Sequence, residues 1–404
     1  MLASNCPFAY GYPLCYNPIS SQITVDRTLL NHEPDNSSLA GTFARQDEVF
    51  LEAFRILEDA IAAKSFPACS IAVLHQGDLV ARKAFGRFTY NRSAQEVTPA
   101  SIFDIASLTK VVATTSMAMI LYERGLLDLE APVAAVVPEF LSASTDDSGW
   151  RAEVTPHTLL AHSSGLPAHT KFYLDQKTRE SLLGAAFASP LVAAPGTRAE
   201  YSDIGFIILG VLLERLADEN LSAFCQREIF GPLGMAHTTF NPSRAIKNNI
   251  PPTADDRSFR HRIVQGEVQD ENASVMGGVA GHAGLFSTAD DLARFAYATL
   301  GGGHPIVRPS TMELFTRRES APDGTSRALG WDSPSTPSQS GKYFSSRSFG
   351  HLGYTGTSLW IDPERRLSVI MLTNRTWPDC SNDTIKRVRP AFHDAVMQAL
   401  GLVA

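Results

Sequence analysis

The chain has 404 residues, of which 44% are hydrophobic and 19% charged, so it holds enough apolar material for a large buried core. Its formal net charge of −7 argues against nucleic acid or an anionic membrane surface as a main partner. The 5 cysteines are scattered and show no Cys-x-x-Cys spacing, so neither a disulfide framework nor a zinc site is indicated. No apolar run reaches the roughly 20 residues that a membrane span needs.

Residues 1–43 are expected to form a partly irregular N-terminal extension, because they mix Pro, Tyr, Asn and Cys without a period. The start shows no basic segment followed by an apolar one, as a secretory signal peptide would, so a cytoplasmic location is expected. The folded domain is expected over residues 44–404.

The first regular elements predict a helix followed by a β-hairpin. Apolar residues keep a helical period from Arg45 to Lys64. Residues 68–74 and 79–85 then alternate like two strands, and the turn His75-Gln76-Gly77-Asp78 between them is typical of a hairpin.

The stretch Asp104-Ile105-Ala106-Ser107-Leu108-Thr109-Lys110 carries the strongest chemical signal. A Ser and a Lys three residues apart lie on one face of a helix, which is expected to begin near Ser107 and end at Gly125. Burial of Lys110 would lower its pKa and let it take a proton from Ser107. The alternative is a solvated pair with Lys110 on the surface, but the apolar residues 111–121 favour a buried helix.

The middle of the chain is expected to be mostly helical. Tyr201-Ser202-Asp203 follows a loop and opens a helix to Leu216, while residues 236–269 are polar and predict long loops. On its own, Tyr201 fits a packed core tyrosine.

Residues 278–284 have the spacing Gly-x-x-Gly-x-x-Gly, which fits a tight loop better than a phosphate loop, since no Gly-Lys-Ser/Thr ending follows. The histidines of this region show no metal-ligand spacing, so no metal is expected; they are His157, His162, His169 and His282.

Strand character returns at residues 353–361 and 367–373, and a last helix is expected over 383–400. His351-Leu352-Gly353 is expected to open the first of these strands, where the small Gly353 lets a substrate approach and the Tyr354 N–H can point at a developing oxyanion. By itself, His351 fits a structural histidine.

Strands at both ends and helices between them predict an α+β fold. An antiparallel sheet formed from both chain ends, about 44–100 and 310–404, would carry packed helices and an inserted all-helical lobe at about 101–309. A ligand is expected in the cleft between the two parts.

The order Ser-x-x-Lys, Tyr-x-Asp, His-x-Gly resembles that of the serine β-lactamase and penicillin-binding protein superfamily, over roughly residues 45–402. It looks closest to the class C-like branch, which includes DD-peptidases and β-lactamase-like carboxylesterases. The resemblance implies an enzyme without metal or cofactor. It also implies Ser107 as nucleophile, Lys110 as its activating base, Tyr201 as acid/base, and the backbone N–H groups of Ser107 and Tyr354 as the oxyanion hole.

Two departures from the family pattern bear on the substrate. Asp203 stands where many members have Asn, and a carboxylate cannot donate to a substrate carbonyl. In the third motif, His351 and Leu352 replace the usual Lys and Thr, so the charge is partial and the hydroxyl is missing. Together with Gly353 these residues would contact the substrate, and the changes favour small neutral esters. The alternatives are a D-Ala-D-Ala carboxypeptidase or weak β-lactamase acting on peptidoglycan-like amides, and a non-catalytic penicillin-binding-type module.

Overall fold

A five-stranded antiparallel sheet joins the two ends of the chain in the computed structural model, which describes residues 43–142 and 148–403. Its strand order is β2-β1-β10-β9-β8. The strands are β1 (Ala68–His75), β2 (Asp78–Gly86), β8 (Phe349–Leu352), β9 (Ser358–Asp362) and β10 (Leu367–Thr373). The predicted α+β fold with a sheet from both termini is confirmed, while residues 1–42 of the expected extension lie outside the described part.

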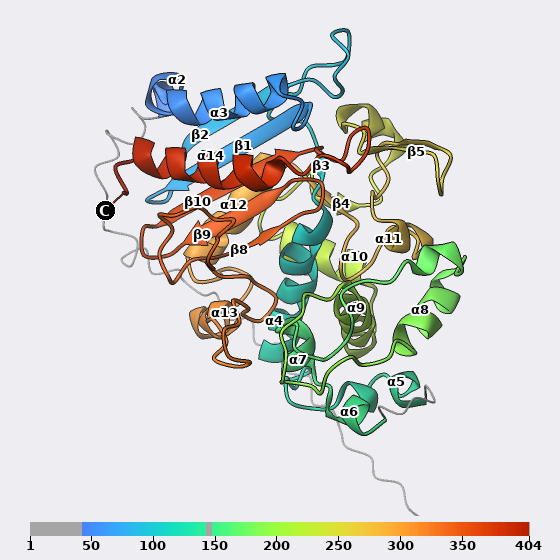
Figure 1. Cartoon of the computed structure of the whole chain (residues 1–404). Coiled ribbons are helices and arrows are strands. Elements are labelled where there is room, and N and C mark those ends of the chain that lie inside the picture. The colour runs from blue at the N-terminus through green and yellow to red at the C-terminus, as the bar shows by residue number, and fades with distance from the viewer. Residues whose placement is uncertain (1–42, 143–147, 404) are drawn as a thin grey trace, which may run out of the picture. The chain divides into compact units, whose positions relative to one another are not determined.

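Helices cover both faces of this sheet (Figure 1). On one face lie α3 (Leu51–Ala62), preceded by the short α2 (Gln46–Val49), and α14 (Ile385–Ala399); on the other lies α12 (Ala289–Leu300). Because the central strand β10 is covered from both sides, all its residues are buried and it shows no polar alternation.

The remaining helices form most of the part that follows β2 in the chain (Figure 1). At its centre, α9 (Asp203–Ala217) is buried over ten consecutive residues, Ile204 to Leu213. The other α-helices are α4 (Ser116–Glu123), α5 (Glu139–Ser142), α6 (Ser148–Glu153), α7 (Pro156–Leu160), α8 (Arg179–Phe187), α10 (Leu221–Cys225), α11 (Glu271–Val275) and α13 (Pro309–Thr316). The 3-10 and π segments are η2 (Ala106–Leu108), η3 (Lys110–Thr115), η4 (Val133–Ala135), η5 (Phe172–Leu174), η6 (Gln226–Phe230) and η7 (Arg244–Asn249).

Two small sheets interrupt the helical part, so the expectation of an all-helical lobe needs correction. One has the order β3-β7-β4, and the other pairs β5 with β6. Three of these strands lie in residues 236–269, where the sequence predicted only loops; the short paired segments have too few residues to show a period of two. The strands are β3 (Phe103–Asp104), β4 (Thr239–Phe240), β5 (Ala254–Asp256), β6 (Arg262–Val264) and β7 (Leu285–Ser287).

Two predicted elements differ near the Ser-x-x-Lys and His-x-Gly motifs. The single helix expected from Ser107 to Gly125 is divided into η2, η3 and α4. His351 and Leu352 close β8 instead of opening a strand, because the chain turns at once: Gly353 N donates to Thr357 O (2.8 Å), and Gly356 has φ +94°.

Among the described residues, no helix combines the length and the apolar character that crossing a bilayer requires.

Candidate active site

Ser107 lies in η2, directly after a backbone bend at Ala106. Ala106 has φ +47°, a left-handed conformation that is uncommon for a residue with a Cβ. The buried Asp104 holds this bend, because its Oδ1 accepts from Ala106 N (2.8 Å) and its Oδ2 from Gln269 N (2.6 Å). Burial raises the pKa of Asp104 to about 6.

Lys110 lies one helical turn after Ser107 and is fully buried. Its Nζ donates to Ser107 Oγ (3.1 Å), to Asp203 Oδ1 (2.7 Å) and to the His282 carbonyl (3.1 Å). An ammonium has three protons, and each has an acceptor here. The structure therefore brings Ser107 and Lys110 together, and it adds two acceptors that the spacing of the motif did not reveal.

The pKa of Lys110 is shifted in the opposite direction to the one that the sequence predicted. Burial disfavours the ammonium, but the Asp203 carboxylate and Tyr201 outweigh burial, so the pKa of Lys110 is raised. The sequence reasoning counted the loss of solvation and missed the carboxylate that compensates it. In the resting site Lys110 is a protonated donor.

Asp203 begins α9 and is engaged from two sides. Its Oδ1 accepts from Lys110, and its Oδ2 lies 3.5 Å from His169 Nδ1. Although burial opposes its ionisation, Lys110 and His169 lower the pKa of Asp203. Asp203 is therefore the ion-pair partner of Lys110. Its expected contact with a substrate carbonyl stays a prediction.

Tyr201 lies against Lys110, with its ring centroid 4.8 Å from Lys110 Nζ. The rings of His162 and His351 lie 4.7 and 5.9 Å from the Tyr201 ring. Burial raises the pKa of Tyr201, and the positive charge of Lys110 opposes this shift without cancelling it. The phenol ring thus lies near Lys110, as expected, but the group is harder to ionise than the sequence reasoning assumed.

His351 was expected to carry a partial positive charge, but it is neutral in this site. Burial, followed by the nearby Lys110 and Arg327, lowers the pKa of His351 to about 3. Its Nδ1 lies 2.8 Å from the Leu352 carbonyl. The Leu352 side chain itself packs against the core cluster shared by α3 and α14.

Gly353 approaches the nucleophile segment closely. A Cβ at this position would lie 1.9 Å from Thr357 Oγ1 and 2.6 Å from the Ile105 carbonyl, so only glycine fits. Tyr354 follows in the turn, and within the described chain neither its N–H nor that of Ser107 donates a hydrogen bond. Both N–H groups are therefore free to bind a ligand.

Sequence reasoning missed one cation of this site. The guanidinium of Arg327 lies 5.3 Å from the Tyr201 ring centroid, and its NH1 is 3.7 Å from Asp332 Oδ1. Arg327 belongs to a short segment that bridges to β8 through Asp332 and Gly350. No local pattern around Arg327 could have identified it, because its role depends on this tertiary pairing.

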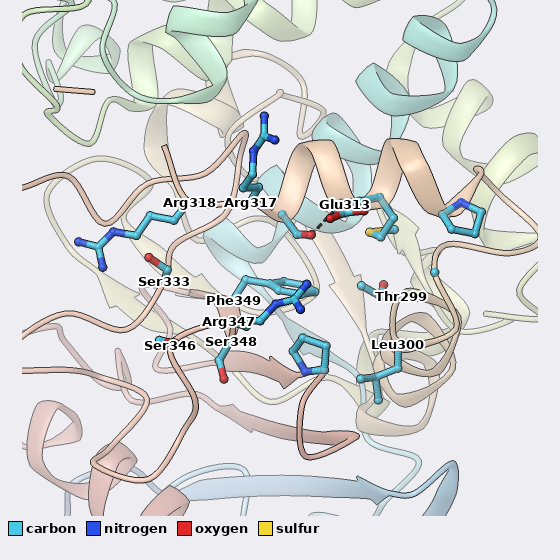
Figure 2. Close-up of a pocket in the computed structure, with 15 residues that line it drawn as sticks. Thr299, Leu300, Glu313, Arg317, Arg318, Ser333, Ser346, Arg347, Ser348 and Phe349 are labelled. Carbon is cyan, nitrogen blue, oxygen red and sulfur yellow. Dashed lines mark hydrogen bonds between the residues drawn. The ribbon is translucent and has the colours of Figure 1, made fainter. Parts of the chain in front are cut away.

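A cavity of about 500 Å³ lies apart from this cluster (Figure 2). Its walls come from α13, the end of α12 and the start of β8, with Phe349 and Arg347 among them. None of the candidate catalytic side chains lines it.

Residues 53–389 match the β-lactamase family. This match covers most of the chain and includes the Ser107, Lys110, Tyr201 and His351 positions. The chain belongs to the β-lactamase family, whose members share the serine β-lactamase and penicillin-binding protein fold.

Relatives of known name extend the comparison. The chain is 33% identical over 354 residues to an N-acetylmuramyl-L-alanine amidase of Bacillus subtilis, a match that covers 80% of each protein. It is 29% identical over 344 residues to a putative D-alanyl-D-alanine carboxypeptidase of Escherichia coli, covering 77% of this chain and 79% of the relative. These names place the chain among hydrolases of this fold.

Solved structures agree on the fold. A penicillin-binding protein homologue from Pyrococcus abyssi, described as octameric, superposes with a TM-score of 0.68 at 24% identity, over 87% of this chain and 77% of that one. EstCE1, described as a hydrolase with promiscuous acyltransferase activity, superposes with a TM-score of 0.71 at 21% identity, over 87% and 99%.

Proposed function

We propose that this protein is a serine acyl hydrolase that forms an acyl-enzyme on Ser107. The observation that carries the proposal is the contact of Lys110 Nζ with both Ser107 Oγ and Asp203 Oδ1 in a buried site. A serine hydroxyl is a poor nucleophile unless a neighbouring group can take its proton. The side chains of Lys110 and Tyr201 are the groups within reach that can do so.

The reaction begins after the Lys110–Tyr201 pair has lost one proton, since both groups are protonated at rest. The pair then takes the proton of Ser107 while Oγ bonds to the substrate carbonyl carbon, and the N–H groups of Ser107 and Tyr354 bind the oxyanion. Tyr201 returns the proton to the leaving alcohol or amine as its bond to the carbonyl carbon breaks. Water attacks the acyl-enzyme by the same route and releases the acid and Ser107.

Small carboxylic esters are the substrates that the third motif favours. With His351 neutral and Leu352 directed into the core, this motif offers neither a cation nor a hydroxyl to a substrate carboxylate. A neutral ester needs only the nucleophile, the proton carriers and the oxyanion hole. The best substrates of this site are therefore short-chain esters.

A second candidate is an amide that carries a carboxylate, such as a D-Ala-D-Ala peptide. Arg327 favours it, because this guanidinium lies beside Tyr201 and could pair with such a carboxylate. The names of the two relatives, an amidase and a putative carboxypeptidase, support an amide as substrate.

A substrate panel separates the two candidates and tests the proposal. Turnover of short p-nitrophenyl esters, a cephalosporin and an acyl-D-Ala-D-Ala peptide is compared in the wild type, in Ser107→Ala and in Arg327→Leu. We expect Ser107-dependent turnover that is fastest for esters, and little effect of Arg327→Leu on them. If the peptide is fastest and Arg327→Leu selectively raises its KM, the second candidate is correct. Arg317→Leu serves as control for loss of an arginine away from the site. A wild type without turnover on any substrate would instead favour the non-catalytic module.

A further inference from the structure

The turn between β8 and β9, residues 353–357, is attached to the segment that carries the nucleophile. Thr355 Oγ1 donates to the Asp104 carbonyl (2.8 Å), and Thr357 Oγ1 donates to the Ile105 carbonyl (3.1 Å). Both hydroxyls are fully buried. The backbone two and three residues before Ser107 is therefore bonded directly to the turn that contains Tyr354.

Arg375, two residues after the end of β10, also contacts this turn. Its Nε donates to the Tyr354 carbonyl (2.7 Å), and its backbone N donates to the Thr355 carbonyl (2.9 Å). Its guanidinium also lies 4.4 Å from the centroid of the Tyr354 ring. A single residue thus binds the carbonyls of two successive peptides, those of Tyr354 and Thr355, and stacks on the Tyr354 ring.

The environment of Arg375 is unusual for a buried cation. The residue is only 9% exposed, and within the described chain no carboxylate pairs with it. Its NH1 instead donates to the carbonyls of Cys380 (3.3 Å) and Asn382 (3.2 Å). A guanidinium whose Nε and NH1 donate to the carbonyls of three different residues is suited to fixing the geometry of several chain segments at once.

We propose that Arg375 is a positioning residue. It orients the Tyr354 N–H so that this group and the Ser107 N–H point at the same oxyanion. This inference rests on the proposed function and adds a residue that does not itself touch the substrate. Thr355 and Thr357 tie the turn to the nucleophile segment, and Arg375 fixes its rotation. Loss of Arg375 lets the Tyr354 N–H turn away from the place where the oxyanion forms, while Ser107, Lys110 and Tyr201 remain in position.

Arg375→Met tests the inference, because methionine keeps an unbranched apolar stem and removes the donors. We expect kcat/KM for the best ester to fall roughly 10- to 100-fold, because the donor is displaced; removing an oxyanion-hole donor outright costs about 100- to 1,000-fold. The affinity for an aryl boronic acid, whose tetrahedral adduct on Ser107 places an oxygen in the hole, falls by a similar factor. The pH profile of kcat/KM keeps its shape, since the proton carriers are untouched.

Three further variants serve as a control, a conservative replacement and a substitute for an unfolded Arg375→Met. Arg387→Met removes an exposed arginine from α14 and leaves both readouts unchanged. Arg375→Lys keeps the charge but cannot reach three carbonyls at once, so it recovers only part of the boronate affinity. If Arg375→Met does not fold, Thr355→Val loosens the same turn and produces the same paired losses.

The outcomes distinguish this inference from the proposed function. If Ser107→Ala retains wild-type turnover, the proposed function fails. If turnover depends on Ser107 and folded Arg375→Met binds the boronate as tightly as Arg387→Met does, the positioning role of Arg375 is overturned while the proposed function stands. A pH profile that changes shape in Arg375→Met would also overturn it, because the damage would then extend to Lys110 and Tyr201.

Discussion

At the scale of single residues, the site is governed by the ion pair between Lys110 and Asp203. The buried Lys110 ammonium and the partly buried Asp203 carboxylate lie 2.7 Å apart and stabilise each other, so removing the carboxylate leaves a buried charge without its ion-pair partner. The pKa of Lys110 is raised and that of Asp203 is lowered, so both groups are ionised at neutral pH. The family pattern with Asn at position 203 lacks this charge, and that difference predicts a distinct pH dependence.

The first prediction concerns Asp203→Asn. A base with a raised pKa is deprotonated only at alkaline pH, so wild-type kcat/KM rises with pH on the alkaline side. Removing the carboxylate lowers the pKa of Lys110, and the rising limb moves to lower pH by about one unit or more. Initial rates with a phenyl ester between about pH 6 and 10 measure the shift.

The matched control is Asp290→Asn, which removes the carboxylate that pairs with Arg82 outside the site and leaves the profile unchanged. Because Asp203 contacts Lys110, the shift is expected for ester and peptide substrates alike. An Asp203→Asn profile that superposes on the wild type would show that the ion pair does not control the base.

At the scale of elements, the site depends on how closely the turn of residues 353–357 approaches η2. Gly353 allows this approach, since a Cβ would lie 2.6 Å from the Ile105 carbonyl. On the other side, Asp104 supports the left-handed Ala106 through its side chain. The two segments that supply the expected oxyanion donors thus approach closely at Gly353 and Ile105, and the buried Thr355 and Thr357 hydroxyls bond them together.

The second prediction follows for Gly353→Ala. The added methyl pushes the turn away from Ile105, so we expect the free energy of unfolding to fall by about 1–3 kcal/mol. We also expect kcat/KM to fall roughly 10- to 100-fold, less than the about 100- to 1,000-fold that a lost oxyanion-hole donor costs, because the Tyr354 N–H moves with the turn. Urea unfolding and ester kinetics measure the two effects.

Gly184→Ala in α8 is the control for this change, because a Cβ there meets nothing within 4 Å. In a helix this substitution stabilises by about 0.5–1 kcal/mol and leaves activity unchanged. Gly353→Ala with wild-type kinetics would mean that the close approach at Ile105 has no part in catalysis.

At the scale of the whole molecule, the sequence predicted the sheet and the order of its motifs better than the charges of the site. Hairpin turns and apolar runs are local, so β1, β2 and β10 were found close to their true bounds. Charge states depend on groups far apart in the chain: Lys110 meets Asp203 across 93 residues. Arg327 and Arg375 reach the site only through tertiary pairing, and no spacing in the sequence marks them.

The acyl-enzyme itself is the most direct measurement of the central claim. Wild-type protein is mixed with a slowly turned-over activated ester, quenched with acid, and examined by intact-protein and peptide mass spectrometry. We predict one added acyl group on the peptide that contains Ser107, and no addition in a folded Ser107→Ala variant with the wild-type melting temperature. An acyl group that persists in Ser107→Ala, or that maps to another residue while turnover continues, would contradict the account.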